Sequence, residues 1–397
     1  FVKLLNMILL YWGEKILFVC FAINIIYLLF FSLFSRNKQR NLLKKNMDKI
    51  KRIAILIPAY KEDLVIMECI QSCMNQDYPA DKYEVVAISD RMKDETNEVL
   101  SKLPIRLIKV YFQNSTKAKA LNYAMEQLGD DYDTAIVLDA DNIIYPDFLQ
   151  KINDAFSEPK VQIVQAHRMA KNLNTNLSIL DAVSEEINNS IFRLGHANVG
   201  LSAALIGSGM AFDYTLFKKI MLSIDAVGGF DRALELSLIK EGKRIYYLSD
   251  VDVLDEKVQS HANFSNQRRR WLSAQIHYLG RFIGDVPAAL LKGNWDFCDK
   301  VFQQMSIPRI LLLGMTFVIS LCLAFIAGGL SIKWWILFFF LILALLLAIP
   351  SSLLNKRLII ALFELPYSFL LMFCNLFRLK GANKKFIHTS HGLDNKK

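Results

Sequence analysis

An uncharged apolar run near the N-terminus constrains the fold of this chain more than any other feature. Residues 16–35 read ILFVCFAINIIYLLFFSLFS and contain no charged side chain. A helix needs about 20 apolar residues to cross the hydrocarbon core of a bilayer, so this run is long enough to span it once. It is longer than the apolar core of a secretory signal, and basic residues from Arg36 to Lys45 follow it in place of a cleavage site. We therefore expect a retained anchor whose C-terminal end lies in the cytosol.

Three further apolar segments follow late in the chain. Residues 307–330 and 334–354 are joined by the short stretch GGLSIK, which predicts a tight external hairpin. The last segment, residues 358–377, contains Glu364 and Pro366 and has basic residues on both flanks. Basic flanks tend to remain in the cytosol, so we expect an interfacial or re-entrant helix here, with a fourth span as the alternative. These segments predict a multi-pass protein of an inner or plasma membrane.

The charge balance indicates which partners the chain binds. Its formal net charge is +9, from 47 Lys and Arg against 38 Asp and Glu. Much of the positive charge lies at the predicted membrane edges, which favours membrane lipids and anionic substrates over nucleic acid. The six cysteines are scattered without the spacing of a zinc site, and we interpret them as reduced packing residues.

Between about residues 50 and 255, short β-branched runs alternate with amphipathic helical patterns. The strand candidates are RIAILIPAY, YEVVAIS, IRLIKVYF, TAIVLDAD, VQIVQAH and RIYYL, and the helical patterns cover residues 62–75, 117–128 and 177–193. This alternation predicts a mainly parallel sheet covered by helices on both faces, with ligands at the carboxyl ends of the strands.

Charged residues follow several of these predicted strands. In TAIVLDADN the alternation of a strand places Asp139 and Asp141 on one side, at the strand's C-terminal end. This pair suits Mg²⁺ or Mn²⁺ with phosphate and water as further ligands, although a solvated strand end has the same pattern. Asp90 ends another strand and fits either a nucleotide contact or a helix cap. Lys117 begins a predicted helix, where a phosphate would be stabilised.

The ordered set of motifs resembles the membrane-integrated family 2 glycosyltransferases, which include cellulose, chitin and hyaluronan synthases and ceramide glucosyltransferase. The matching features are IPAYKED, Asp90, KAKALNYA, DADN, GSGM at 207–210, an acidic helix start near 231, QRRRW at 267–271 and HTSH at 388–391. The resemblance implies an α/β GT-A (Rossmann-like) catalytic domain with a mixed, mainly parallel sheet, plus an α-helical transmembrane region. It also implies inverting, metal-dependent transfer from a UDP-sugar to a glycan or lipid acceptor.

The resemblance also implies roles for the charged residues named above. Asp90 would contact the nucleotide and Lys117 would lie near it. Asp139 and Asp141 would bind the diphosphate through Mg²⁺ or Mn²⁺. In the tail, His391 would touch a phosphate from a gating loop, with a disordered basic tail as the alternative.

The chain departs from the family pattern at the general base. The family usually has an acidic pair within TED, whereas this sequence reads GGFDRALELSLIKEG. Aligned on the leucines and the glycine, Asp231 takes the place of the catalytic aspartate and Phe230 replaces the acid before it. Glu235 lies one helical turn further, so both carboxylates can face one cavity. We predict Asp231 as the base and Glu235 as its support or substitute, with a helix cap and a surface charge as the structural alternatives.

The QRRRW segment separates into two roles if residues 264–283 form one helix. Helical spacing then places Gln267, Arg270 and Trp271 on one face and turns Arg268 and Arg269 elsewhere. The resemblance implies that Arg270 stabilises the departing diphosphate, that Trp271 packs against the acceptor sugar and that Gln267 donates a hydrogen bond. The other two arginines fit contacts with the membrane surface.

The GSGM segment completes the predicted acceptor site. Gly207, Ser208 and Gly209 would supply a flexible backbone beside the acceptor, because glycine permits close approach. A plain turn has the same sequence pattern.

We divide the chain into four regions. Residues 1–47 form an N-terminal transmembrane helix and basic linker, and residues 48–263 form a cytosolic GT-A domain. Residues 264–302 form interfacial helices with QRRRW, and residues 303–397 form a transmembrane hairpin, an interfacial or re-entrant helix and a gating-loop-like tail. The predicted function is synthesis of a polysaccharide from a UDP-sugar with coupled translocation. A non-processive enzyme acting on a lipid and a non-catalytic component of glycan export are the alternatives.

Overall fold

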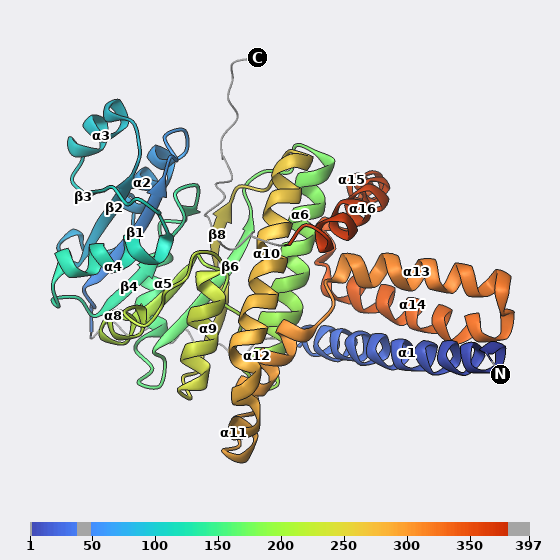
Figure 1. Cartoon of the computed structure of the whole chain (residues 1–397). Coiled ribbons are helices and arrows are strands. Elements are labelled where there is room, and N and C mark those ends of the chain that lie inside the picture. Colours follow the sequence, from blue (N-terminus) through green and yellow to red (C-terminus); the bar gives the residue numbers. More distant parts are fainter. Residues whose placement is uncertain (1, 38–48, 380–397) are drawn as a thin grey trace.

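The computed structural model describes residues 2–37 and 49–379. The role expected for His391 therefore lies outside the described residues. An α/β domain occupies one side of the molecule, and long apolar helices project away from it (Figure 1).

An eight-stranded sheet forms the centre of the α/β domain, in the order β3-β2-β1-β4-β7-β6-β8-β5. Strands β1, β2, β3 and β4 run parallel, β7 runs antiparallel to β4 and β6, and β8 is parallel to β6 and antiparallel to β5. The strands are β1 (Ile53–Tyr60), β2 (Tyr83–Asp90), β3 (Arg106–Val110), β4 (Thr134–Val137), β5 (Ile143–Ile144), β6 (Ile163–Ala170), β7 (Met210–Asp213) and β8 (Tyr246–Asp255). The mixed, mainly parallel sheet is confirmed, and β5 and β7 are additional short strands.

Helices cover both faces of the sheet, which explains why its strands are apolar on both sides. Within β1, Ala54 and Leu56 face one core cluster while Ile53, Ile55 and Ile57 face the other. The first cluster includes α4 (Lys117–Leu128), α8 (Tyr214–Met221) and α9 (Phe230–Lys240). The second includes α2 (Ile66–Met74), α3 (Asp94–Ser101) and α5 (Phe148–Ala155).

Two helical segments connect this domain to the apolar helices. The helix α6 (Asn176–Asn188) continues into a π-helical turn, Asn189–Gly195, and the short α7 (His196–Asn198), and the turn packs against α1 (Val2–Phe34). The helix α10 (His261–Phe282) carries QRRRW, so the predicted single helix over this segment is confirmed. It leads into α11 (Val286–Leu291) and α12 (Trp295–Met305).

The helices α1, α13 (Arg309–Ile326) and α14 (Gly328–Ala348) project from the domain together (Figure 1). Each is long and apolar enough to cross a membrane. The turn between α13 and α14 is Ala327, so the prediction that GGLSIK forms the loop is wrong. This stretch forms the start of α14, where Lys333 Nζ lies 2.7 Å from Glu14 Oε1 of α1.

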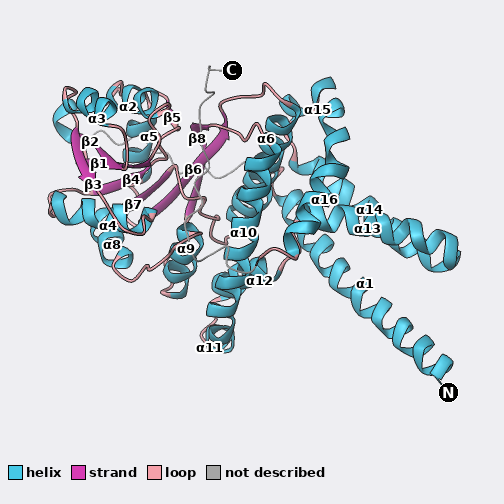
Figure 2. Ribbon diagram, turned by 45° about the horizontal axis from the view of Figure 1, so that its top comes forward, coloured by secondary structure: helices cyan, strands magenta, loops and turns pink. Residues whose placement is uncertain are grey.

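The last apolar segment differs from the hairpin in direction. It consists of α15 (Lys356–Ala361), a 3₁₀ turn (Leu362–Glu364) and α16 (Leu365–Leu376), and it is a fourth candidate span by length and composition. Pro366 lies in the first turn of α16, where its missing N–H breaks no helical bond. Both views show these helices at an angle to α13 and α14 (Figures 1 and 2), and α16 contacts α10 and α13. The interfacial or re-entrant helix and the fourth span both stay predictions for this segment.

Candidate active site

Three carboxylates meet beyond the carboxyl ends of β4 and β8. Asp139, Asp141 and Asp255 each place an oxygen within 4.8 Å of the others. Asp141 and Asp255 are buried, whereas Asp139 is partly exposed. Oxygen ligands in this arrangement fit a hard divalent cation that takes its remaining ligands from phosphate and water. The sequence analysis did not identify Asp255, although it ends an apolar strand just as Asp139 follows one.

Hydrogen bonds fix the loop after β4 against the end of β8. The Asn142 amide donates to Asp255 Oδ1 at 3.1 Å, and Asn142 Oδ1 accepts from the backbone N–H of Asp139 at 3.0 Å. The backbone N–H of Glu256 donates to Asp141 Oδ2 at 3.1 Å. The two predicted metal ligands are therefore held in place by their immediate chain neighbours and by β8.

Buried cations balance the charge of the third carboxylate. Asp255 Oδ2 lies 2.8 Å from Lys257 Nζ, and Asp255 Oδ1 lies 3.4 Å from Arg168 Nη1. Burial alone raises the pKa of Asp255, but these two cations hold the pKa below its usual value. Asp255 therefore stays ionised, and like Asp139, which pairs with Lys117, it has a cationic neighbour. Asp139 and Asp141 stay the predicted metal ligands, with Asp255 beside them.

Lys117 joins the loop after β4 to the GSGM segment. It is the first residue of α4, whose N-cap Thr116 accepts from the backbone N–H of Lys119. The Lys117 ammonium donates to the Asp139 carboxylate and, at 2.7 Å, to the backbone oxygen of Gly207. Lys117, the predicted phosphate-binding lysine, thus lies where the loop after β4, with Asp139 and Asp141, meets the GSGM segment.

A buried glutamine shapes the GSGM segment. Gln165 Nε2 donates to the backbone oxygens of Ser208 and Gly209 at 3.0 and 3.1 Å, and Gln165 Oε1 accepts from the N–H of Ile206. Ser208 is fully buried, so its side chain presents no surface to an acceptor. Gln165 was missed by the sequence analysis, and its signal is a polar residue inside the apolar strand VQIVQAH.

Asp231 lies in the first turn of α9, next to the GSGM segment. A Cβ built on Gly207, whose φ is +91°, would lie 3.8 Å from the Asp231 Cβ. Asp231 is partly exposed, whereas Glu235 is buried with its Oε1 3.2 Å from Lys300 Nζ of α12. Burial raises the pKa of Glu235, and Lys300 opposes this shift. Glu235 is thus enclosed between α9 and α12 while Asp231 is partly exposed, yet the charge of Asp231 still contributes to the raised pKa of Glu235. Their shared cavity stays a prediction.

Arg270 faces this site from α10. Burial lowers the pKa of its guanidinium, and the charges of Asp139 and Asp231 oppose that shift. Arg270 therefore lies near both the metal loop and the predicted base. Gln267 and Trp271, its predicted companions on this face, are partly buried.

The neighbouring Arg268 differs from its prediction. It forms an ion pair with Asp181 of α6, and its side chain is 12% exposed. Its guanidinium carbon lies 4.3 Å from the ring centroid of Trp271, so part of the indole is covered. Arg268 thus contacts α6 and Trp271, where the sequence predicted a contact with the membrane surface.

Asp90 ends β2 at the same edge of the sheet. It is 2% exposed, and its Oδ1 has no hydrogen-bond partner among the described residues. Burial raises the pKa of this carboxyl group, and a Ser115 hydrogen bond opposes the shift. Such a group can accept a hydrogen bond from a ring N–H of a nucleobase.

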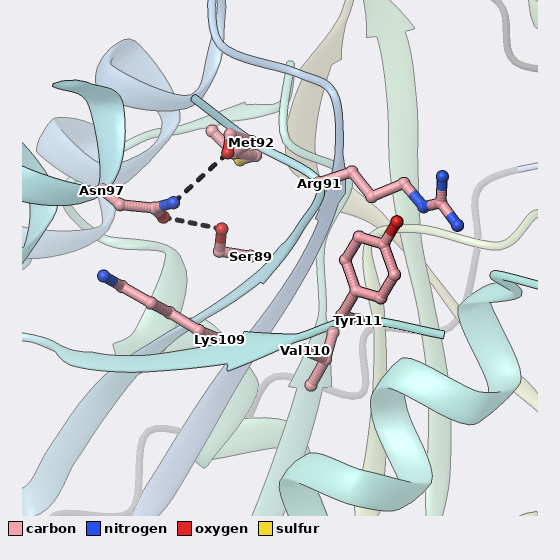
Figure 3. A pocket seen from close by; sticks show the side chains of 7 residues that line it. All are labelled: Ser89, Arg91, Met92, Asn97, Lys109, Val110 and Tyr111. Carbon is pink, nitrogen blue, oxygen red and sulfur yellow. Dashed lines mark hydrogen bonds between the residues drawn. The ribbon is translucent and has the colours of Figure 1, made fainter. Parts of the chain in front are cut away.

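A pocket of about 270 Å³ lies near the ends of β2 and β3 (Figure 3). The Ser89 hydroxyl donates to Asn97 Oδ1 at 2.6 Å on one side of it, and the Arg91 guanidinium lies 4.5 Å from the Tyr111 ring centroid on the other. Its lining residues are Ser89, Arg91, Met92, Asn97, Lys109, Val110 and Tyr111. The sequence analysis singled out none of them.

Comparisons with known proteins agree with this geometry. A family model described as "Glycosyltransferase like family 2" matches residues 51–274. The chain is 26% identical over 208 residues to the Methanococcus voltae dolichyl N-acetyl-alpha-D-glucosaminyl phosphate 3-beta-D-2,3-diacetamido-2,3-dideoxy-beta-D-glucuronosyltransferase, covering 49% of this chain and 63% of that protein. It is 22% identical over 342 residues to the probable glycosyltransferase YdaM of Bacillus subtilis (strain 168), covering 80% of both chains.

One solved structure shows the same fold. The mannosyltransferase PcManGT from Pyrobaculum calidifontis, in complex with GDP-Man and Mn²⁺, superposes with a TM-score of 0.52 at 16% sequence identity. The match covers 83% of this chain and 96% of that one. The GT-A fold expected from the sequence is therefore confirmed.

Proposed function

Since the chain belongs to glycosyltransferase family 2 and is a glycosyltransferase, we propose that it transfers a sugar from a UDP-sugar to an acceptor at the cytosolic face of an inner or plasma membrane. One observation carries this proposal. Asp139, Asp141, Lys117 and Arg270 converge beside the partly exposed Asp231 at the carboxyl edge of the sheet.

The nucleotide diphosphate would lie along this edge. The unpartnered oxygen of Asp90 accepts a hydrogen bond from the base, while Lys117 and Arg270 contact the phosphates. Asp139 and Asp141 would hold Mg²⁺ or Mn²⁺, and the bound ion would supply positive charge to the departing diphosphate. Arg270 adds donors to the same charge, and its partial burial strengthens that interaction.

Asp231 acts as the general base in an inverting transfer. Its carboxylate accepts the proton of the acceptor hydroxyl while that oxygen attacks the anomeric carbon. The bond between this carbon and the diphosphate breaks, and its electron pair leaves with the UDP. The ion pair between Glu235 and Lys300 makes Glu235 a positioning residue for the first turn of α9, not a substitute base.

The packing of the apolar helices supports a lipid acceptor over translocation of a polymer. Most side chains buried among α1, α13 and α14 are apolar, and they include Phe21, Ile25, Leu312, Trp334 and Leu341. The buried hydroxyls of these helices, on Ser32, Thr316, Ser320 and Ser331, each donate to a backbone oxygen of their own helix. A glycan needs a polar passage, and these hydroxyls are already engaged within their helices. The dolichyl phosphate in the name of the Methanococcus voltae relative agrees with a lipid-linked acceptor.

Polysaccharide synthesis with coupled translocation remains the second candidate, favoured by the QRRRW segment on α10. The family match and the cluster of carboxylates support an enzyme over a non-catalytic component of glycan export.

Nucleotide release from the full chain in lipid nanodiscs tests the proposal. A panel of UDP- and GDP-sugars with Mg²⁺ or Mn²⁺ is compared, and the product is sized by mass spectrometry. We expect UDP release with one sugar added per lipid. A long glycan product would overturn the lipid acceptor in favour of polymer synthesis. Nucleotide release from GDP-sugars alone would overturn the UDP-sugar as donor. Absence of release from every donor would overturn the proposed activity.

A further inference from the structure

One face of α6 holds charges that the catalytic site does not use. Asp181, Ser184 and Glu185 occupy positions i, i+3 and i+4, so they lie along one side of the helix. Asp181 and Glu185 are buried. Arginines reach this face from four different segments: β6, the π-helical turn after α6, α10 and α13.

Three of these arginines are paired with carboxylates. Arg168 and Arg193 each lie 3.0 Å from a Glu185 oxygen, and Arg268 forms an ion pair with Asp181. Since a buried charge is costly unless it is paired, these contacts account for three of the four cations.

Arg309 differs from the other three. Its Nη2 donates to the backbone oxygen and the hydroxyl of Ser184 at 3.1 and 3.2 Å, both of which are neutral acceptors. No carboxylate within residues 2–37 and 49–379 forms an ion pair with Arg309. Its Nη1 is enclosed and has no hydrogen-bond partner among these residues, and the same is true of Arg268 Nε.

The electrostatic surroundings favour an anion at this point. The positive charges of Arg268 and Arg193 act on the Arg309 guanidinium, and the Glu185 carboxylate opposes them. Arg309 is also the first residue of α13, so it lies where a candidate membrane span leaves the α/β domain. Basic pockets beside membrane helices on the cytosolic side commonly bind phosphate headgroups.

We propose that Arg309 and Arg268, together with the Ser184 hydroxyl, bind the phosphate group of an anionic membrane lipid at the junction of α6, α10 and α13. The phosphate oxygens accept charge-assisted hydrogen bonds from Arg309 Nη1 and Arg268 Nε and supply the missing negative charge. The proposed site uses none of the carboxylates Asp139, Asp141 and Asp255, although Arg168 and Lys257 connect Glu185 to Asp255.

Native mass spectrometry of the detergent-purified full chain tests this site. The probes are phosphatidylglycerol and diacylglycerol with the same acyl chains, and inorganic phosphate serves as a soluble competitor. We expect retention of phosphatidylglycerol but not of diacylglycerol, and an affinity about tenfold lower in Arg309→Gln, as loss of one charge-assisted hydrogen bond predicts. Arg357→Gln is the matched control, because Arg357 is an exposed arginine at the start of α15.

A second variant has the opposite expected sign. Asp181→Asn removes the carboxylate that competes with the phosphate for Arg268, so it should tighten phosphatidylglycerol binding several-fold. If Arg309 and Asp181 had only a structural role, both Arg309→Gln and Asp181→Asn would weaken binding. Equal retention of the two lipids, unchanged binding in Arg309→Gln, or weaker binding in Asp181→Asn would overturn the proposal. Displacement of the lipid by equimolar inorganic phosphate would overturn the lipid as occupant. Asp231→Asn should bind phosphatidylglycerol as the wild type does, which separates this site from the catalytic proposal.

Discussion

The Glu235 carboxylate of α9 lies 3.2 Å from the Lys300 ammonium of α12, and both side chains are buried. This ion pair connects α9, which carries Asp231 in its first turn, to α12, which precedes the apolar helix α13. Because both charges are buried away from water, each one offsets the free-energy cost of burying the other.

Replacing one partner of this ion pair should destabilise the protein more than replacing both partners. Lys300→Met leaves an uncompensated buried carboxylate and should cost about 3–5 kcal/mol. The double variant Glu235→Gln/Lys300→Met should recover most of that loss, as measured by thermal unfolding in detergent. Equal melting temperatures for the single and double variants would contradict this account of the pair.

Gly229 should be essential for the position of α9 against α10. Its φ is +64°, and an added Cβ would lie 2.8 Å from the Ala274 Cβ. Gly229→Ala should therefore lower both the melting temperature and kcat, at a cost of at least about 1 kcal/mol. Gly242→Ala is the matched control, since Gly242 has φ +75° but nothing within 4 Å of its added Cβ. Equal effects of the two changes would show that the contact with Ala274 is unimportant.

Asp141→Asn should weaken the metal site selectively. The change removes one charged oxygen ligand, so the Mn²⁺ concentration for half-maximal activity should rise at least roughly tenfold. The control is Asp147→Asn, because Asp147 is an exposed carboxylate paired with Lys151 outside the cluster. A metal requirement that is the same in both variants would remove Asp141 from the proposed ligands.

The stability of the protein should fall as the pH rises from about 6.5 to 9. Burial lowers the pKa of His167, but hydrogen bonds to Asp252 and Glu186 outweigh this and raise the pKa from 6.5 to about 9. The folded state therefore binds a proton more tightly than the unfolded state. Protonated His167 therefore contributes up to about 3 kcal/mol to the free energy of unfolding. This contribution is fully present below pH 6.5 and is lost as the pH passes 9.

Thermal unfolding of wild type and His167→Gln across this pH range checks the assignment. The variant should lose most of the pH dependence in this window. If the stability of His167→Gln fell with pH as steeply as that of the wild type, another group would be responsible for the pH dependence.

The sequence predicted the features that depend on local patterns. Alternation along TAIVLDAD placed Asp139 and Asp141 at a strand end, and helical spacing separated Arg270 from Arg268. Both results require only the geometry of one element. The same reasoning identified three of the candidate membrane spans.

The remaining features depend on contacts between distant segments. Asp255 meets the metal loop because the Asn142 amide reaches across to the end of β8. Glu235 is drawn into the packing between α9 and α12 because Lys300, 65 positions later in the chain, lies opposite it. Spacing within α9 cannot reveal that partner. GGLSIK was expected to be a loop because it is a short joint between two long apolar runs, whereas contacts of α14 with α1 favour helix there.

The role of Asp231 as general base is measured by the rate of UDP release from Asp231→Asn in nanodiscs. Asp225→Asn, at an exposed position before α9, is the control. We expect kcat to fall by about 10²–10⁴-fold in Asp231→Asn while the KM for the donor changes little, because the base acts only on the acceptor hydroxyl. UDP release from Asp231→Asn at the wild-type rate would show that Asp231 is not the base.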